Sequence, residues 1–321
     1  MSPSQKSPSL SQSFTIAFYN TENLFDIYND RSKHDRDYLP NSERRWTKKR
    51  YQNKLDKIGL AISKIGLAET GNLPSIIGLA EVENGKVIRD LLETSYLKNT
   101  PYSFVHFNSK DERGMDVALI YNNTDFTVTH SEIYAIQFER PEGGDDFTRD
   151  ILLVTGMLKG ETISVLVNHW SSRREGTQLS EVKRLQASEK VSEIIKDIQT
   201  KQTDAKIIIM GDFNDDPHCK SITQLTENNN VFNPMNTLQS YNRGSLVHQI
   251  KWHLFDQIMF TMPFFESREN HLEFDSVNIF DADFLKEYKG RHKGTPFRTY
   301  AGNKHKGGYS DHFPVYMTLK K

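Results

Sequence analysis

The sequence predicts an α/β protein of the α+β kind, in which mixed β-sheets are covered by helices. Predicted strands outnumber predicted helices, and some follow one another closely enough to form hairpins, as across Lys159-Gly160-Glu161. Two long amphipathic segments, predicted as helices over Arg44–Ala68 and Gln178–Ile198, each link one buried strand to the next. This mixture favours mixed sheets over a purely parallel, doubly wound sheet.

The predicted strands are short apolar runs that lie between turn-like stretches. They cover Phe14–Tyr19, Ser75–Ala80, Ser103–Phe107, Val117–Tyr121, Phe126–Ile136, Asp150–Leu158, Thr162–Val167, Lys206–Met210, Leu254–Phe260 and Pro314–Leu319. Asn84 is predicted to cap a short helix that runs to Leu92.

Length and composition are those of a folded domain. The chain has 321 residues, 19 of them Phe and 13 Tyr, which is enough for a large core. Residues 1–13 are rich in Ser and Pro, and we expect a disordered arm there, followed by a single domain over residues 14–321. The first residues lack the apolar segment of a secretory signal, and no apolar run approaches the ~20 residues of a membrane helix.

The cysteine content and the net charge limit the compartment and the partners. Cys219 is the single cysteine, so an internal disulfide is impossible, and we expect a cytoplasmic protein while leaving secretion open. The net charge of −1 does not indicate a nucleic-acid or membrane partner, so any attraction for phosphate has to be local. The sequence predicts no obligate protein partner.

The most informative stretch is IIIMGDFNDDP, residues 207–217. Its apolar run predicts a strand buried on both faces, and the turn residues that follow end that strand abruptly. Asp212 and Asn214 are two residues apart, so in an extended backbone their side chains point the same way. Read alone, so short a string is better explained as a strand that ends in an Asx-rich turn.

Four further apolar runs begin or end beside polar side chains of the same kind. These side chains are Asn20, Glu81, His169, and the pair Asp311 and His312. A random globular chain places such residues at strand ends once or twice. Their repetition predicts a site held on rigid strands at the rim of a core.

The residue types suit chemistry on a phosphate. Glu81 is a candidate ligand of Mg²⁺ or Mn²⁺, although a helix-capping or ion-paired carboxylate is the alternative. His312 is able to hold or deliver a proton near neutral pH, with Asp256 as the carboxylate that orients its ring. Arg173 and Arg174 match phosphate oxygens, or are simply solvated.

A basic loop precedes Asp311. Between Lys289 and Lys306 there are six Lys or Arg residues and two His, and no acidic residue follows before Asp311. Such a loop, with Arg298 as a candidate phosphate ligand, supplies the local attraction that the net charge does not. Phe297 and Tyr300 either stack on a base or anchor the loop. The alternative for the whole segment is a solvated, flexible loop.

Together these motifs identify a family. The strings FYNTEN, IGLAEVEN, LVNHWSSR, MGDFNDDP, FDQIMF and GGYSDHFPV, in this order, resemble the endonuclease/exonuclease/phosphatase superfamily and its poorly characterised bacterial members. The resemblance implies a deoxyribonuclease I-like fold, a four-layer sandwich of two packed mixed β-sheets flanked by helices. It also implies Mg²⁺-dependent hydrolysis of phosphate esters. G-x-S-x-G, H-E-x-x-H and paired cysteines, which mark other hydrolases and zinc sites, are absent from the sequence.

The resemblance also implies roles for the site residues. Glu81 is the principal metal ligand, with Asn20 and Asp311 nearby, and Asp212 activates or positions the attacking water. Asn214 and His169 hydrogen-bond phosphate oxygens. His312, oriented by Asp256, stabilises developing charge or assists the leaving oxygen.

The expected substrate is nucleic acid. A small-molecule or lipid phosphoester is the first alternative, and a catalytically silent binding module is the second. Ser171 stands where similar bacterial sequences commonly have Pro, which leaves the shape of the Arg173 loop open. No residue matches the substrate-binding Tyr of the abasic-site repair branch, so abasic-site specificity is unsupported.

Overall fold

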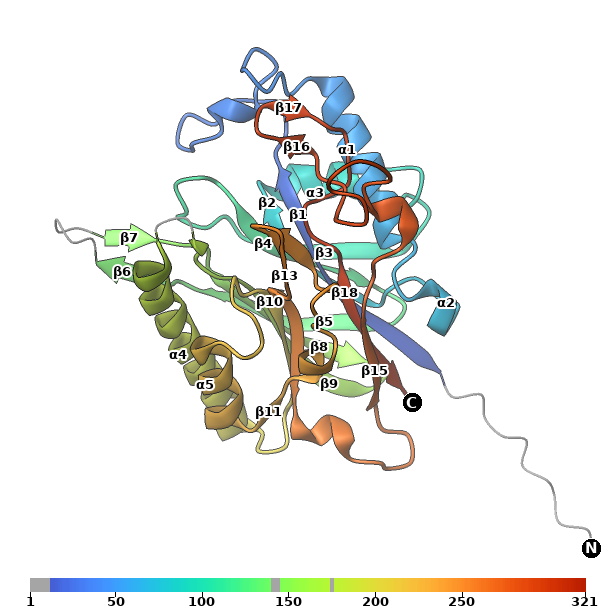
Figure 1. Ribbon diagram of the computed structural model, residues 1–321. Helices are drawn as coiled ribbons and strands as arrows, with labels where there is room; N and C mark the ends of the chain where they lie inside the picture. Colours follow the sequence, from blue (N-terminus) through green and yellow to red (C-terminus); the bar gives the residue numbers. More distant parts are fainter. Residues whose placement is uncertain (1–11, 140–144, 174–175) are drawn as a thin grey trace, which may run out of the picture.

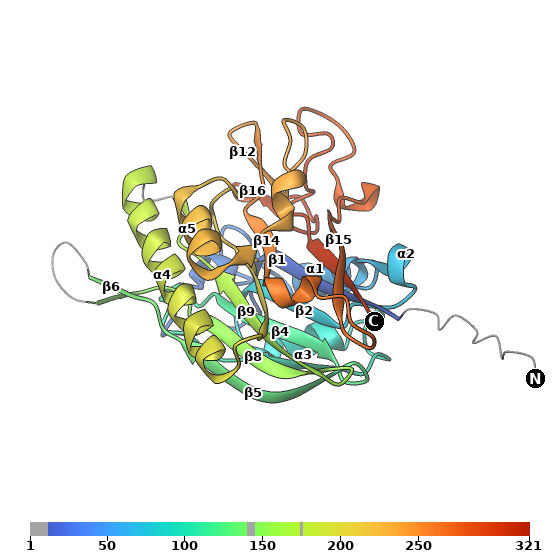
Figure 2. The same ribbon diagram turned by 90° about the horizontal axis from the view of Figure 1, so that it is seen from below.

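Two six-stranded β-sheets pack face to face, and helices cover their outer sides (Figures 1 and 2). The structure is a computed structural model that describes residues 12–139, 145–173 and 176–321. Each sheet is mixed, because β1 runs parallel to β2 in one and β9 runs parallel to β10 in the other, while the remaining pairs are antiparallel. The predicted four-layer sandwich is confirmed.

The bounds of the elements are as follows. The first sheet contains, in spatial order, β15 (Glu273–Ile279), β18 (Val315–Lys320), β1 (Ser13–Leu24), β2 (Ile76–Val82), β4 (Asp116–Asn122) and β3 (Tyr102–His106). The second contains β11 (Val231–Phe232), β14 (Asp256–Thr261), β10 (Lys206–Asp212), β9 (Glu161–His169), β8 (Ile151–Leu158) and β5 (Phe126–Tyr134). The helices are α1 (Lys48–Ile62), α2 (Leu67–Thr70), α3 (Gly85–Leu92), α4 (Thr177–Lys201) and α5 (Lys220–Asn229). Short 3-10 turns cover Arg36–Tyr38, Pro234–Thr237, Met262–Phe265 and Asp283–Leu285.

Three small hairpins lie outside the two large sheets in the described part of the chain. They are β6 (Gln137–Glu139) with β7 (Asp145–Phe147), β12 (Leu246–His248) with β13 (Lys251–His253), and β16 (Tyr300–Ala301) with β17 (Lys304–His305). The last of these lies within the basic segment, so that segment is partly ordered by backbone pairing rather than being a plain loop.

Strand β10 lies at the centre of the core. All seven of its residues are buried, as its uninterrupted apolar run predicts. Ile208 and Met210 belong to the core between the two sheets. Ile207 and Ile209, on the opposite face, pack with Val191 and other apolar residues of the layer formed by α4 and α5, which Figure 2 shows on one side of the molecule.

Several predicted boundaries shift by a few residues. The first helix is shorter than predicted because it begins at Lys48, after the capping hydroxyl of Thr47, and ends at Ile62. The Asn84 cap is confirmed, since its side chain accepts from the backbone of the first turn of α3. Ser13 already pairs with Lys320 in β1, one residue inside the predicted arm, and residues 1–11 lie outside the described residues.

Strand β15 and helix α5 escape the sequence analysis. Strand β15 is only partly buried, so its sequence lacks the apolar run of a buried strand. Helix α5 is short and polar, with Asn and Thr residues that favour turns. None of the helices within the three described ranges combines the length and the apolar character needed to cross a lipid bilayer.

Candidate active site

The register of the second sheet brings three polar side chains to one edge. Asp212, the last residue of β10, is opposite His169 on β9 and opposite Asp256, the first residue of β14. The sequence suggested that Asp256 lies inside a strand, but Asp256 is the first residue of β14. All three side chains are almost completely buried. Two carboxylates directly opposite each other are unfavourable unless cations or donors lie between them.

A hydrogen bond joins the two sheets at this edge. The Asn20 side chain, at the point in β1 where the pairing with β2 begins to slip, donates its amide N–H to Asp212 Oδ2 at 2.9 Å. The Asn20 oxygen accepts from the Glu22 backbone N–H at 3.0 Å. Asn20 thus holds the Asp212 carboxylate, a contact that its predicted position near a metal did not foresee.

Backbone irregularities aim the side chains of the site. Glu22, Asn23, Glu81 and Asn214 all have positive φ, between 52° and 61°, which is uncommon for residues other than glycine. The first three lie where the pairing of β1 with β2 slips, at a bulge. Bulges commonly redirect a side chain beside an active site. Here the bulge lets the Asn23 backbone N–H donate to Glu81 Oε2 at 2.7 Å.

The turn after β10 is also tighter than an extended chain. The Asn214 backbone N–H donates to Asp212 Oδ1 at 3.0 Å, which is an Asx turn. The Asn214 amide donates one hydrogen to the Trp170 carbonyl at 3.1 Å and keeps a second. The backbone between Asp212 and Asn214 is therefore not extended, and the predicted conformation was wrong. The turn and the candidate site nevertheless coincide.

His312 and Asp256 form a buried pair. His312 Nδ1 lies 2.6 Å from Asp256 Oδ2, and Nε2 faces Asp212 Oδ2 at 4.0 Å and Asp311 Oδ1 at 3.9 Å. Burial lowers the pKa of His312, but the attraction of Asp256 and the hydrogen bond to it outweigh burial and hold that pKa well above the usual range. Asp256 therefore orients an imidazolium whose Nε2–H points into the site.

The pKa of the Asp212 carboxyl is shifted toward neutrality. Burial raises the pKa of the Asp212 carboxyl to about 7, against the opposing attraction of His312. A carboxyl with a pKa near neutrality is suited to accept a proton.

His169 has a neighbour that the sequence did not reveal. The Arg149 guanidinium, just before β8, spans the His169 ring, with Nη2 2.8 Å from Nε2 and Nε 3.3 Å from Nδ1. His169 Nε2 also lies 3.7 Å from Asp212 Oδ2 and 3.9 Å from Glu81 Oε1. Burial lowers the pKa of Arg149 to about 10. Nothing in the local sequence distinguishes this arginine from a surface cation.

The donor set fits a hard divalent cation. Glu81 Oε1 and both oxygens of Asp311 have no hydrogen bond shorter than 3.4 Å in the described part of the chain. The two side chains keep 18% and 31% of their surface exposed, so a cation has access to them. Carboxylate oxygens with this freedom are ligands that Mg²⁺ and Mn²⁺ accept. Asp212, Asp256 and His312 also lie close enough together to hold an ion, but Asp256 and His312 already bind each other.

Family comparison agrees with this geometry. The model of the endonuclease/exonuclease/phosphatase family matches residues 15–321. The chain belongs to this family. Its members are metal-dependent hydrolases of phosphate esters, and this chain is one of them, as the sequence predicts. A search of curated proteins finds no match.

Solved structures of the family have the same fold. A family member from Bacteroides thetaiotaomicron is 16% identical, with a TM-score of 0.61 over 97% of this chain and 98% of that chain. TDP2 from D. rerio, solved with a single-strand DNA product, is 14% identical, with a TM-score of 0.56 over 96% and 99%. A mannosyl-6-phosphatase from Bacteroides thetaiotaomicron is 15% identical, with a TM-score of 0.56 over 95% and 99%. At these identities the likeness shows the fold.

Arg173 contacts the turn that follows β10, beside the candidate site. Its guanidinium donates to the Asn214 carbonyl at 3.0 Å and to Asp215 Oδ1 at 2.9 Å, and it stacks on Phe255 at 4.7 Å. The buried Arg184 lies 2.7 Å from the same aspartate. Arg173 therefore holds the turn after β10, and its role at a substrate phosphate stays a prediction. Arg174 lies outside the described residues.

The basic segment is anchored from below. Glu22 accepts from the Thr299 backbone N–H at 2.6 Å, and the buried Lys54 donates to Thr299 Oγ1 and to the Tyr309 carbonyl at 2.5 Å each. The Tyr300 ring packs on Trp46, so Tyr300 anchors the segment instead of being available to stack on a nucleobase. Arg298 stays at the site, with Nη2 3.4 Å from Asp311 Oδ2.

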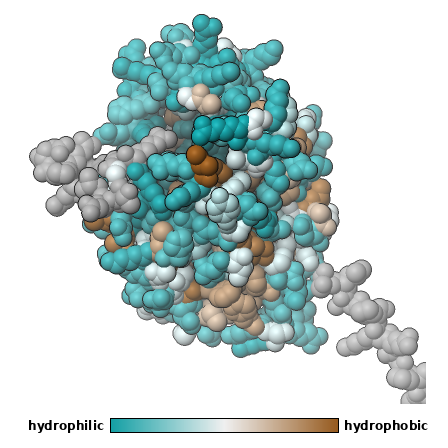
Figure 3. All heavy atoms as spheres, viewed as in Figure 1, coloured by the Kyte–Doolittle hydropathy of each residue, from teal (hydrophilic) through white to brown (hydrophobic). Residues whose placement is uncertain are grey.

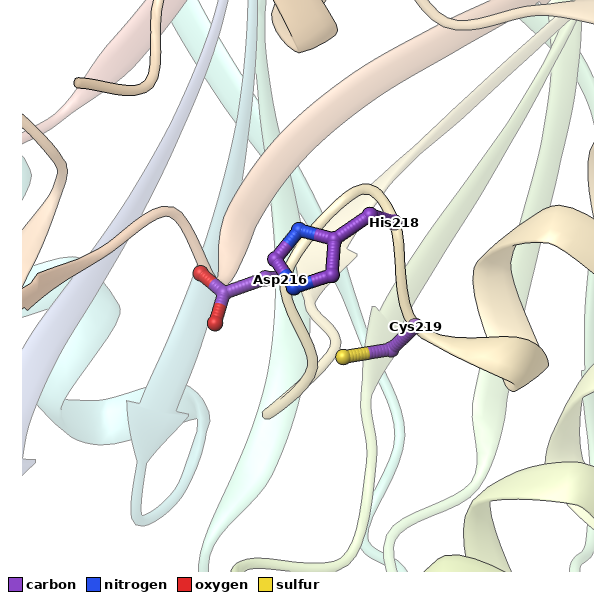
Figure 4. A group of neighbouring side chains, drawn as sticks. All are labelled: Asp216, His218 and Cys219. Carbon is purple, nitrogen blue, oxygen red and sulfur yellow. The ribbon is translucent and has the colours of Figure 1, made fainter.

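A second polar cluster stands on the turn before α5. Asp216, His218 and Cys219 lie near one another there (Figure 4). Asp216 Oδ1 accepts from Gln239 and from the Leu254 backbone N–H, and Oδ2 lies 2.7 Å from His253 Nδ1. Because its oxygens already have these partners, Asp216 ties the turn to β13. It is a poor third ligand for an ion.

Proposed function

We propose that this protein is a Mg²⁺-dependent nuclease that hydrolyses phosphodiester bonds in nucleic acid by attack of water on phosphorus. The single observation that carries the proposal is a ring of groups at one edge of the sheets, the catalytic ring, in which Asn20, His169 and His312 face Asp212 and Glu81 faces His169. The preference for nucleic acid rests on the basic segment that borders this ring at Asp311.

Glu81 and Asp311 are the residues that would hold the metal, with the Asn20 oxygen as a further donor. A bound Mg²⁺ supplies Lewis-acid polarisation of a phosphoryl oxygen, and Mn²⁺ is an alternative.

Asp212 is the proposed general base. Its carboxylate accepts a hydrogen bond from Asn20 on one oxygen and from the Asn214 backbone on the other, so the orientation of the carboxylate is fixed. A fixed carboxylate removes a proton from a water molecule placed in line with the leaving oxygen.

His312 and the Asn214 amide are the proposed donors to the phosphate. The His312 Nε2–H stabilises charge on the phosphoryl or leaving oxygen, and Asp256 keeps the ring oriented for this task. His169 is a further proposed donor on the opposite side of Asp212, because its Nδ1 accepts from Arg149 Nε and its proton then lies on Nε2, the nitrogen nearer Asp212.

A second candidate function is a phosphatase or phosphodiesterase that acts on a small or lipid phosphate. Two observations favour it. The pocket beside Asp311 has a volume of about 500 Å³, which suits a small ligand. One of the similar structures is a mannosyl-6-phosphatase.

The test compares supercoiled plasmid, bis-p-nitrophenyl phosphate and p-nitrophenyl phosphate, each with Mg²⁺, Mn²⁺ or EDTA. We expect metal-dependent cleavage of plasmid and diester, and a loss of about 10²–10⁴-fold in His312→Ala. His130→Ala, on the exposed face of β5, is the matched control and should retain activity. Hydrolysis of the monoester with intact plasmid would move the assignment to the second candidate function.

A further inference from the structure

A pocket opens beside the candidate active site, between the β12–β13 hairpin and the basic segment. It has a volume of about 500 Å³, and Asp311 is part of its lining. Asp311 is adjacent to His312 and faces it, so a molecule whose phosphate sits at the ring of catalytic candidates extends directly into this pocket. The pocket therefore meets the group that is covalently attached to the reacting phosphate.

The hairpin wall of the pocket carries a strained apolar tip. Gln249 and Ile250, which connect β12 to β13, have φ of 48° and 71°, the conformation of a two-residue turn that favours Asn-Gly. A β-branched residue in this conformation is a genuine outlier. Ile250 is also 79% exposed, on a molecule whose drawn face is mostly hydrophilic (Figure 3). Neither the backbone nor the solvent favours Ile250, so its presence points to a ligand contact.

The hairpin is fixed relative to the catalytic candidates. Leu246, at its base, pairs with His312, and the Phe313 backbone N–H donates to the Ser245 carbonyl at 2.7 Å. The Trp252 ring stacks on the Phe313 ring, with centroids 6.1 Å apart. Because of these contacts, the apolar wall formed by Ile250 and Trp252 holds its position beside His312.

The opposite wall carries cations with unused donors. The Arg291 guanidinium has no ion-pair or hydrogen-bond partner within the described residues. Arg298 has one long contact, to Asp311, which leaves most of its donors available. Lys306, by contrast, is paired with Glu287 at 3.1 Å. Two available guanidinium groups match the oxygens of a phosphate.

We propose that this pocket binds the terminal nucleotide of a single strand, next to the scissile phosphate. The base lies against Ile250 and Trp252, and the second phosphate of the nucleotide lies at Arg291 and Arg298. This inference rests on the proposed function and names its substrate class. A sugar monophosphate places its one phosphate at the catalytic ring and has no second phosphate for Arg291 and Arg298 to bind. The interior of a duplex does not enter a pocket of this size.

The test measures binding rather than turnover. Adenosine 5′-monophosphate, adenosine 3′,5′-bisphosphate and mannose 6-phosphate are titrated by calorimetry into the wild type in the presence of Mg²⁺. A phosphate bound by charge-assisted hydrogen bonds should make the bisphosphate bind about 10–100-fold more tightly than the monophosphate. Arg291→Gln should remove most of this advantage. Lys293→Gln, a change of the same charge in the same exposed segment but outside the pocket, should preserve it.

The apolar wall has its own variant. Ile250→Gly should weaken both adenosine ligands by the same factor, while its unfolding midpoint stays or rises because the strained turn relaxes. Three results would each overturn the inference. The wild type binds the two adenosine ligands equally tightly, Arg291→Gln and Lys293→Gln lose the same affinity for the bisphosphate, or mannose 6-phosphate binds as tightly as the bisphosphate. Because these titrations need no turnover, plasmid cleavage without a bisphosphate advantage refutes the pocket assignment alone. Tight bisphosphate binding without hydrolysis of any ester refutes the proposed function alone.

Discussion

The backbone at Glu81 provides a test that separates the site from the fold. Glu81 has φ of 61° at the bulge in β2, and its carboxylate is the proposed metal ligand. Two variants, Glu81→Ala and Glu81→Gly, both remove the carboxylate, so both should lose metal-dependent hydrolysis. They should differ in stability, because only glycine adopts this conformation without steric cost.

The size of that difference follows from the geometry. Both variants lose the bond from the Asn23 N–H to Glu81 Oε2, so this term cancels between them. The left-handed conformation destabilises the alanine variant by about 1–2 kcal/mol. The greater conformational freedom of glycine in the unfolded chain destabilises the glycine variant by about 0.4–1 kcal/mol, which offsets part of this difference. Glu81→Gly should therefore be more stable than Glu81→Ala by about 1 kcal/mol.

Urea unfolding in EDTA measures this difference without a contribution from bound metal. Ala80→Gly, one residue earlier in β2 where φ is not positive, is the control and should lose about 0.5–1 kcal/mol or more. If Glu81→Ala were as stable as Glu81→Gly, the strained bulge would be refuted. If either variant kept metal-dependent hydrolysis, the proposed ligand role would be refuted.

Three other predictions concern the site and its support. Asp256→Asn should lower kcat by about 10²–10⁴-fold, because His312 loses the partner that orients it and holds its pKa high, and steady-state kinetics would show this; unchanged kcat would exclude the orienting role. Lys206→Met should cost about 1–3 kcal/mol in urea unfolding near neutral pH, since Glu161 loses its shortest charged contact and keeps only the Leu272 N–H and the longer contacts to His271 and Lys321. Lys190→Met, at an exposed pair, should cost less than about 1 kcal/mol. Burial raises the pKa of Glu161, but the hydrogen bonds from Lys206 and Leu272 outweigh burial and lower that pKa below its ordinary value of 4.5. The Lys206–Glu161 pair therefore stabilises the fold above pH 4.5, and its contribution to the free energy of unfolding should vanish as the pH falls through the lowered pKa. A stability loss in Lys206→Met that does not change with pH would contradict this assignment.

Local sequence was enough to predict most strands of the two large sheets and the two long helices, and it singled out most residues of the candidate site. The apolar run before Asp212 required a strand buried on both faces, and such a strand needs a covering layer on each side. Polar residues that directly follow or precede buried strands are also visible in the sequence. They include Asn20, Glu81, His169 and His312, which the folded chain brings to one edge.

Tertiary structure decided what these residues contact. The positive φ of Glu81 is fixed by strand pairing around a bulge, which no local pattern encodes. Arg149 reaches His169, and Arg173 reaches Asp215, because partners far apart in the sequence meet only when the sheets pack. Side-chain type and strand periodicity are properties of neighbouring residues and can be read from the chain. The hydrogen-bond partners of polar side chains depend on long-range packing, and only the folded structure supplies them.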